Sequence, residues 1–191
     1  LEHLSFFNGL MEENGGKKPL WVTEFGTYSG TPSNQPMQPA PGGPQPQQQP
    51  PQPASSSSTQ TEGFQAAWYF KNSIAAFANG ASRLFIDLTG RDNDAIGSSA
   101  LFNAGGAPRA FAVTLETIAE KLAGFSQSRE IGGGQYEFTV SGKRVYALWN
   151  GALPAEVSGR VKVTGFNGLE KTVDSSQVEL RADEPVFVEP A

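Results

Sequence analysis

The chain has 191 residues, 38% of them hydrophobic, and a formal net charge of −5, which allows one large domain or two small ones. This acidic balance gives no reason to expect nucleic acid or an anionic membrane as a partner. The absence of cysteine excludes disulfides and thiolate metal sites, and the single histidine, His3, argues against a zinc centre or a Ser-His relay. We therefore expect no metal and no cofactor. No apolar run approaches the ~20 residues of a membrane span, so we also expect no membrane-spanning segment.

Residues 1–14 carry apolar side chains at the spacing of an amphipathic helix. These side chains recur every three or four residues and so share one face: Leu1, Leu4, Phe7, Leu10 and Met11. Gly15 and Gly16 follow in the usual place for a helix end. The sequence begins inside this helix, without an initiator methionine or a signal peptide, and we expect a fragment cut on its N-terminal side.

The stretch Leu20–Tyr28 combines a short apolar strand with a carboxylate at its carboxyl end. Its apolar and β-branched residues predict a buried strand of a parallel sheet, with Trp21 in the core. A carboxylate is costly to bury unless it is paired or hydrogen-bonded. In a (β/α)8 barrel the carboxyl ends of the strands form the catalytic face. Glu24 is therefore a candidate catalytic carboxylate, and the alternative is a carboxylate that caps the next turn or pairs with an arginine.

Residues 31–60 differ in composition from both of their flanks. Nine prolines and eight glutamines occupy this segment, and Ser55 to Ser58 lie near its end. Such a composition cannot bury enough apolar area to offset the entropy of ordering, so we expect a disordered or polyproline-like insertion. A tolerated insertion is one interpretation, and a lid or tether over the site is the other.

The segments that follow alternate between helix and strand. We predict a helix from Thr61 to about Asn79, a short apolar strand at Leu84–Leu88 and a third helix that begins at Pro108. The first of these helices has a broad apolar face, made by Phe64, Ala67, Trp68, Ile74, Ala75 and Ala78. This alternation is typical of a parallel α/β architecture. Because two strands cannot close a sheet, we expect earlier strands to be missing.

After Ser126 the apolar residues recur with period two, which predicts strands. Ser141-Gly142 provides a tight hairpin connection between the first two of them. The apolar residues of the predicted strands are Tyr136/Phe138/Val140, Val145–Trp149, Val161/Val163, Leu169–Val173, Val178/Leu180 and Val186/Val188. Residues 125–191 are therefore expected to form a small antiparallel β-sandwich packed against the last helix.

With these elements placed, the chain resembles the retaining (β/α)8-barrel glycoside hydrolases, a clan that includes cellulases and β-xylosidases. The stretch Lys18–Gly26 looks like the seventh barrel strand with its nucleophile motif, TEFG. The other matching segments are Gln65-Ala66, Asn79-Gly80-Ala81, Pro108-Arg109-Ala110-Phe111 and the tail Ala182–Glu189. The resemblance implies an α/β plus all-β fold: the last two βα units of a barrel in residues 1–124, and a β-sandwich in 125–191.

The resemblance also implies a chemistry for three residues. Retaining glycosidases use two carboxyl groups about 5–5.5 Å apart, one as nucleophile and one as acid and then base. Glu24 matches the nucleophile, whereas the family's Asn-Glu acid/base pair has no counterpart here, so this chain alone is expected to be inactive. Tyr28 could stack on a sugar ring or be a plain surface aromatic. Asp87 could hydrogen-bond a sugar hydroxyl or cap the loop that follows it.

The function implied is therefore the carboxyl-terminal portion of a retaining glycoside hydrolase that cleaves β-linked glycans through a covalent glycosyl-enzyme intermediate. Its partners would be a polysaccharide or oligosaccharide and the missing N-terminal half of the barrel. An extracellular or periplasmic location is consistent with the resemblance and with the Pro/Gln/Ser insertion. Two alternatives are a non-catalytic carbohydrate-binding or surface-adhesion protein with a degenerate barrel, and a different barrel enzyme.

Overall fold

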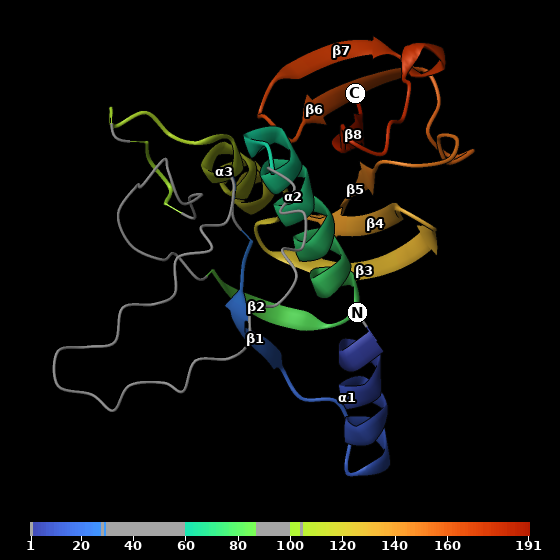
Figure 1. Ribbon diagram of the computed structural model, residues 1–191. Coiled ribbons are helices and arrows are strands. Elements are labelled where there is room, and N and C mark those ends of the chain that lie inside the picture. The colour runs from blue at the N-terminus through green and yellow to red at the C-terminus, as the bar shows by residue number, and fades with distance from the viewer. Residues whose placement is uncertain (1, 28, 30–59, 87–99, 104) are drawn as a thin grey trace, which may run out of the picture.

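The structure is a computed structural model that describes residues 2–27, 29, 60–86, 100–103 and 105–191 (Figure 1). The elements are α1 (Glu2–Glu13), β1 (Leu20–Phe25), α2 (Glu62–Ala78), β2 (Ala81–Ile86), α3 (Ala110–Leu122), β3 (Phe125–Gly132), β4 (Gln135–Val140), β5 (Lys143–Leu148), β6 (Arg160–Gly165), β7 (Glu170–Asp174), a 3-10 helix (Ser175–Gln177) and β8 (Val186–Pro190). The alternation of helix and strand from α1 to α3 confirms the order predicted from the sequence.

The strands β1 and β2 form a two-stranded parallel sheet, with α2 as the crossover between them. Val22 lies opposite Leu84, and Phe25 lies opposite Ile86. Parallel pairing places the carboxyl ends of both strands at the same edge, as a βαβ unit requires. Only these two parallel strands occur in the described ranges, so the other strands of a barrel are not among them.

The helix ends follow the signals in the sequence. Gly15 and Gly16 both adopt positive φ after α1, and the Gly16 N–H donates to the Met11 carbonyl at 2.8 Å. Thr61 caps α2, and its hydroxyl accepts from the Phe64 N–H at 3.0 Å. These bonds satisfy backbone groups that the helix termini would otherwise leave unpaired.

The buried face of α2 agrees with the predicted one at Ala67, Ile74 and Ala75 and differs at Phe64. Phe64 was expected to face the core but is 54% exposed, while Gln65 and Ser73 are buried. The buried residues of this helix are Gln65, Ala66, Ala67, Tyr69, Phe70, Ser73, Ile74, Ala75 and Ala76. The prediction was wrong for Phe64 because α2 packs on two other sides, against α3 and β1 on one and against the large sheet on the other. Such a helix has no single apolar stripe.

The carboxyl-terminal strands form one antiparallel sheet in the order β3-β4-β5-β8-β6-β7. The antiparallel β-region is confirmed. The two separate sheets of a sandwich are not formed by these strands, because β8 pairs with β5 on one side and with β6 on the other. Ser141 and Gly142 both have positive φ, which is the conformation of the predicted tight hairpin between β4 and β5.

The strand predicted at Val178/Leu180 is absent from the described structure. A 3-10 helix, Ser175–Gln177, follows β7 instead, and the Asp174 carboxylate and the Gln177 side chain cap it reciprocally. Val178 and Leu180 then pack against the second core cluster without pairing. Val178 and Leu180 are two residues apart because both face the core. A loop that lies along the core can show this spacing as well as a strand can.

Two hydrophobic clusters cover the two faces of the large sheet. The first joins Phe70 and Ile74 of α2 and Ile118 of α3 to the sheet residues Phe138 and Phe187. It therefore crosses the predicted domain boundary at 124/125. The second, on the opposite face, includes Tyr146, Val161 and Val188 together with residues of the β5–β6 and β7–β8 connections. Figure 1 shows α2 and α3 lying against β3, β4 and β5.

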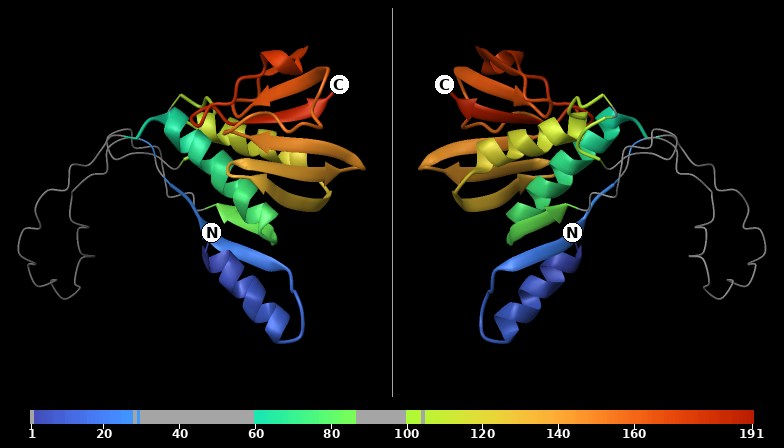
Figure 2. Two further views of the ribbon diagram at one scale, coloured as in Figure 1. Left: turned by 90° about the vertical axis from the view of Figure 1, so that its right-hand side faces the viewer. Right: turned by 90° about the vertical axis from the view of Figure 1, so that its left-hand side faces the viewer.

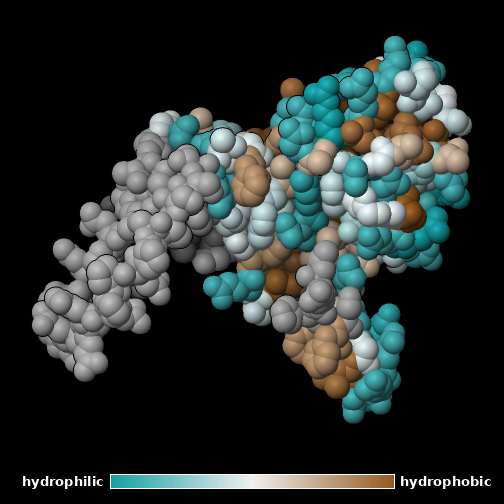
Figure 3. Space-filling view, turned by 45° about the vertical axis from the view of Figure 1, so that its right-hand side comes forward, coloured by the Kyte–Doolittle hydropathy of each residue, from teal (hydrophilic) through white to brown (hydrophobic). Residues whose placement is uncertain are grey.

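The elements α1, β1 and β2 project from this body (Figure 2). Trp21, which was predicted to be in the core, is 53% exposed and contacts Phe85 and Arg83 on the open face of the small sheet. Hydrophobic atoms also cover much of the projecting part that carries α1 (Figure 3), where Phe6 and Phe7 are exposed. The prediction was wrong because a two-stranded sheet offers no further strand to cover these side chains.

Candidate active site

Glu24 lies at the carboxyl end of β1, one residue before the strand ends, and its side chain is exposed. The register between β1 and β2 shifts between Val22 and Phe25, so Thr23 and Glu24 interrupt the regular pairing. Such irregularities redirect side chains and are frequent next to active sites. Among the residues that the structure describes, none forms a hydrogen bond or an ion pair with the Glu24 carboxylate. This carboxylate is therefore exposed, with no partner among the described residues.

The segment after Glu24 is held by two polar side chains of α2. The Gln65 Nε2 donates to the Thr27 carbonyl at 3.0 Å. The Tyr69 hydroxyl lies 3.3 Å from both the Thr27 N–H and the Thr27 carbonyl oxygen. The Thr27 hydroxyl donates to Gln60 Oε1 at 3.4 Å, just before α2 begins. Thr27 thus obtains from a helix the hydrogen bonds that a neighbouring strand would otherwise supply.

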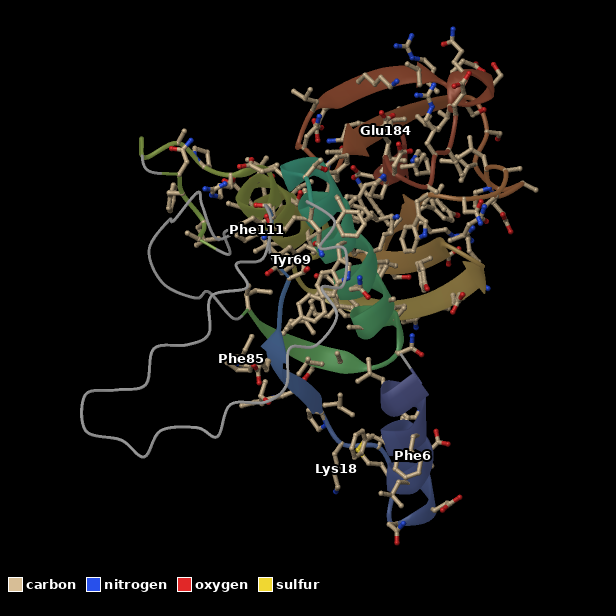
Figure 4. All side chains as sticks on the ribbon, viewed as in Figure 1. Phe6, Lys18, Tyr69, Phe85, Phe111 and Glu184 are labelled. Carbon is tan, nitrogen blue, oxygen red and sulfur yellow. The ribbon has the colours of Figure 1, made fainter. Side chains whose placement is uncertain are left out.

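A cluster of aromatic rings from β1, α2 and α3 packs next to the segment that follows Glu24. The Phe25 ring lies 5.2 Å from that of Trp68 and 5.9 Å from that of Tyr69. Tyr69 in turn stacks on Phe111 of α3, with ring centroids 5.0 Å apart. Figure 4 shows Tyr69 and Phe111 together between α2 and α3, away from Phe85 and Phe6. Offset and edge-to-face contacts of this kind fix ring orientations as well as burying area.

An ion pair joins the starts of the two helices near this site. The buried Arg109, which precedes α3, donates through Nη1 to the Glu62 carboxylate in the first turn of α2. A carboxylate in the first turn of a helix is also favoured by the helix dipole. The Gln65, Tyr69 and Arg109 roles were not predicted from the sequence. The available signal was Gln65, Tyr69 and Ser73 at intervals of four residues, which places three polar groups on one face of the helix.

The two predicted substrate-binding residues, Tyr28 and Asp87, lie outside the described residues. Their neighbours can be placed, since Thr27 is bound to α2 and Ile86 ends β2 opposite Phe25. In the described ranges no group of three or more His, Cys, Asp or Glu side chains could hold a metal ion. In the same ranges, no helix is both long and apolar enough to cross a membrane.

The chemistry available to this arrangement comes from one exposed carboxylate, that of Glu24. Exposed to solvent at the rim of a parallel sheet, it can act as a nucleophile, a base or an electrostatic stabiliser. Glycoside hydrolysis requires a second carboxyl group, and the pattern of a family acid/base was not found in the sequence. A reaction of that kind would need a second carboxyl group in addition to Glu24.

The comparisons with known proteins agree with this architecture. No protein-family profile matches the chain, and no curated protein sequence matches it. A solved structure, a family 39 glycoside hydrolase from the gut symbiont Bacteroides cellulosilyticus WH2, matches 98% of the chain with a TM-score of 0.60 at 14% sequence identity. The chain spans 38% of the length of that protein. The chain thus shares its fold with part of a glycoside hydrolase.

Proposed function

We propose that this chain is the carboxyl-terminal part of a retaining glycoside hydrolase that cleaves β-linked glycans, with Glu24 as the nucleophile. The observation that carries the proposal is the position of Glu24. It is an exposed carboxylate at the carboxyl end of a strand paired in parallel with its neighbour, in a fold shared with part of a glycoside hydrolase. The carboxyl ends of parallel strands are where barrel enzymes bind and transform their substrates.

In the proposed reaction the Glu24 carboxylate attacks the anomeric carbon of a β-linked sugar. A carboxylic acid outside the described residues protonates the departing oxygen, and a covalent glycosyl-enzyme forms. Water, deprotonated by the same second residue, then releases the sugar with its original configuration and frees Glu24. The attack requires the nucleophile in its carboxylate form.

The second half of the site is assigned to further βα units of a barrel. Parallel sheets occur almost only with both faces covered and with several strands, whereas β1 and β2 stand alone in the described chain. On one face of this pair Trp21 and Phe85 are exposed. On the other an apolar groove of about 690 Å³ runs between β2 and α3, lined by Leu84 and Leu115 among others. Additional barrel strands and helices would cover both surfaces. We also propose an extracellular or periplasmic location, where glycan polymers are accessible.

The proposal is tested by replacing Glu24 in the protein that carries this sequence. We expect Glu24→Gln to lower kcat/KM on 4-nitrophenyl β-glycosides by about a thousandfold or more, since it removes a covalent nucleophile. Glu120→Gln, an exposed glutamate on α3, is the matched control and should leave the activity unchanged. The melting temperatures of both variants should stay near that of the parent, because Gln keeps the shape of Glu.

A second variant distinguishes a nucleophile from a binding carboxylate. Glu24→Ala leaves space for azide, which should attack a 2,4-dinitrophenyl β-glycoside directly and give the α-glycosyl azide. Activity of Glu24→Gln within severalfold of the parent would remove Glu24 from the nucleophile role. A parent protein that binds β-glucans or β-xylans but hydrolyses none of the nitrophenyl β-glycosides would favour the non-catalytic carbohydrate-binding alternative.

A further inference from the structure

Two polar side chains of α2 are buried next to the segment that follows Glu24. Gln65 and Tyr69 are both 0% exposed, and Tyr69 belongs to a hydrophobic cluster with Ala66 and Phe111. An amide or a hydroxyl buried among apolar groups is unfavourable unless it is hydrogen-bonded. Leucine and phenylalanine would fill the same space without that penalty. The polar groups therefore require a purpose beyond packing.

That purpose is found in the backbone of Thr27. Gln65 binds its carbonyl, and the Tyr69 hydroxyl lies within hydrogen-bond distance of both its N–H and its carbonyl oxygen. On the other side of Gly26, the Phe25 ring packs against Trp68 and Tyr69. Residues within about one turn of α2 thus contact the chain on both sides of Gly26, the glycine that follows β1.

The strand pairing alone does not fix Glu24. Its partner strand is in regular register at Val22 and again at Phe25, with a shift between them. The carboxylate itself has no hydrogen bond or ion pair with another described residue. Its direction must therefore be set by its flanks, and the nearest anchored flank is Phe25 to Thr27, which α2 holds.

We propose that Gln65 and Tyr69 are positioning residues that fix the direction in which β1 presents Glu24. The two side chains hydrogen-bond the Thr27 backbone, and the proposal does not require either of them to contact the substrate. The consequence for the reaction rests on the proposed function, while the effect on the backbone does not. Small displacements of a reacting group are sufficient to slow catalysis by about a hundredfold.

The test compares Tyr69→Phe and the double variant Gln65→Leu/Tyr69→Phe with Tyr146→Phe. Tyr146 is 1% exposed and belongs to β5 of the large sheet, so its loss reports only the general effect of removing a buried hydroxyl. Amide hydrogen exchange at Thr27 is measured first. We expect exchange to be about tenfold faster in Tyr69→Phe, because the bond to the amide is lost, and unchanged in Tyr146→Phe.

Steady-state kinetics on the 4-nitrophenyl β-glycosides are measured next. Tyr69→Phe should lower kcat by about tenfold and the double variant by about a hundredfold, with KM within twofold of the parent. A merely structural role would lower the melting temperature and leave kcat per folded molecule unchanged.

The outcomes separate the two proposals. Unchanged Thr27 exchange in the double variant overturns the positioning role, whatever the activity. Faster exchange with an unchanged kcat in an active parent also overturns it. A parent that hydrolyses no glycoside refutes the proposed function, and the exchange rates then still decide whether Gln65 and Tyr69 hold this segment.

Discussion

Two regions of the molecule treat similar side chains differently. In the body formed by α2, α3 and the six-stranded sheet, Phe70 is 0% exposed and contacts Phe187 and Trp149. In the projecting part formed by α1, β1 and β2, Trp21 is 53% exposed. Both rings belong to regular elements with an apolar pattern. The difference teaches that a side chain with an apolar pattern is buried only where other elements pack against it. The candidate active site lies in the part of the described chain that has few such packing elements.

The site itself lies where these two regions meet. Glu24 belongs to the projecting part, while the side chains that hold its flank, Gln65 and Tyr69, belong to the body. A rigid element that supports a functional group at the edge of a less covered one is a common arrangement for active sites. In this account the body holds the flank of the candidate nucleophile, which the projecting part carries.

The most direct way to sharpen the comparison is to truncate one ring in each region. We expect Phe70→Ala to lower the free energy of unfolding by about 3–5 kcal/mol, since it empties the contact between α2 and the large sheet. Trp21→Ala should change it by less than about 1 kcal/mol, since half of the ring is already in water. Chemical denaturation of the parent and both variants measures this. Equal losses would contradict the distinction between the regions.

A turn within the body provides a smaller test of how tightly that region is built. Gly134 has φ near 79°, and a Cβ there would lie 2.6 Å from the Trp149 Nε1. We expect Gly134→Ala to lower the stability by about 1–3 kcal/mol through backbone strain and this contact. Gly133→Ala is the control, because nothing lies within 4 Å of a Cβ at that position. Similar midpoints of thermal unfolding for the two variants would argue against close packing here.

The smallest expected effect concerns the charges that tie α3 to the sheet. The Lys121 ammonium lies 2.7 Å from carboxylate oxygens of both Glu170 and Glu189. Hydrogen bonds from Lys121 and then Lys162 lower the pKa of Glu170 from 4.5 to about 2. Because this folded-state pKa lies below the unfolded one, the stabilisation is present above pH 4.5 and is lost as the pH falls toward 2.

The magnitude is modest because the Glu170 side chain is 46% exposed, and solvent screening reduces it to about 1 kcal/mol. Denaturation at pH 6 and at pH 2.5 should therefore show a smaller acid loss in Glu170→Gln than in the parent. Identical acid losses would show that this network does not contribute.

The sequence predicted the parts of the fold that local chemistry decides. Thr61 and Asn79-Gly80 bound α2 where expected, and Ser141-Gly142 forms the predicted hairpin. It also predicted the strand that carries Glu24, whose parallel pairing is confirmed. The misses arose where burial depends on distant partners. Trp21 is exposed because no further strand lies beside it, and Phe64 is exposed because α2 buries its other sides.

Two further misses have the same cause. The strand Phe125–Gly132 was not assigned because its middle is polar, and pairing with β4 makes it a strand. The hold of Gln65 and Tyr69 on Thr27 joins residues about 40 positions apart in sequence. No local pattern encodes that contact, although buried polar residues on an apolar helix face point to it.

The most direct test of the central claim is covalent trapping of Glu24. The protein that carries this sequence would be incubated with 2,4-dinitrophenyl 2-deoxy-2-fluoro-β-glycosides, which form the glycosyl-enzyme but release it slowly. Peptide mass spectrometry should then find the 2-fluoroglycosyl group on Glu24. A label on another carboxylate, in a protein that turns over β-glycosides, would contradict the account.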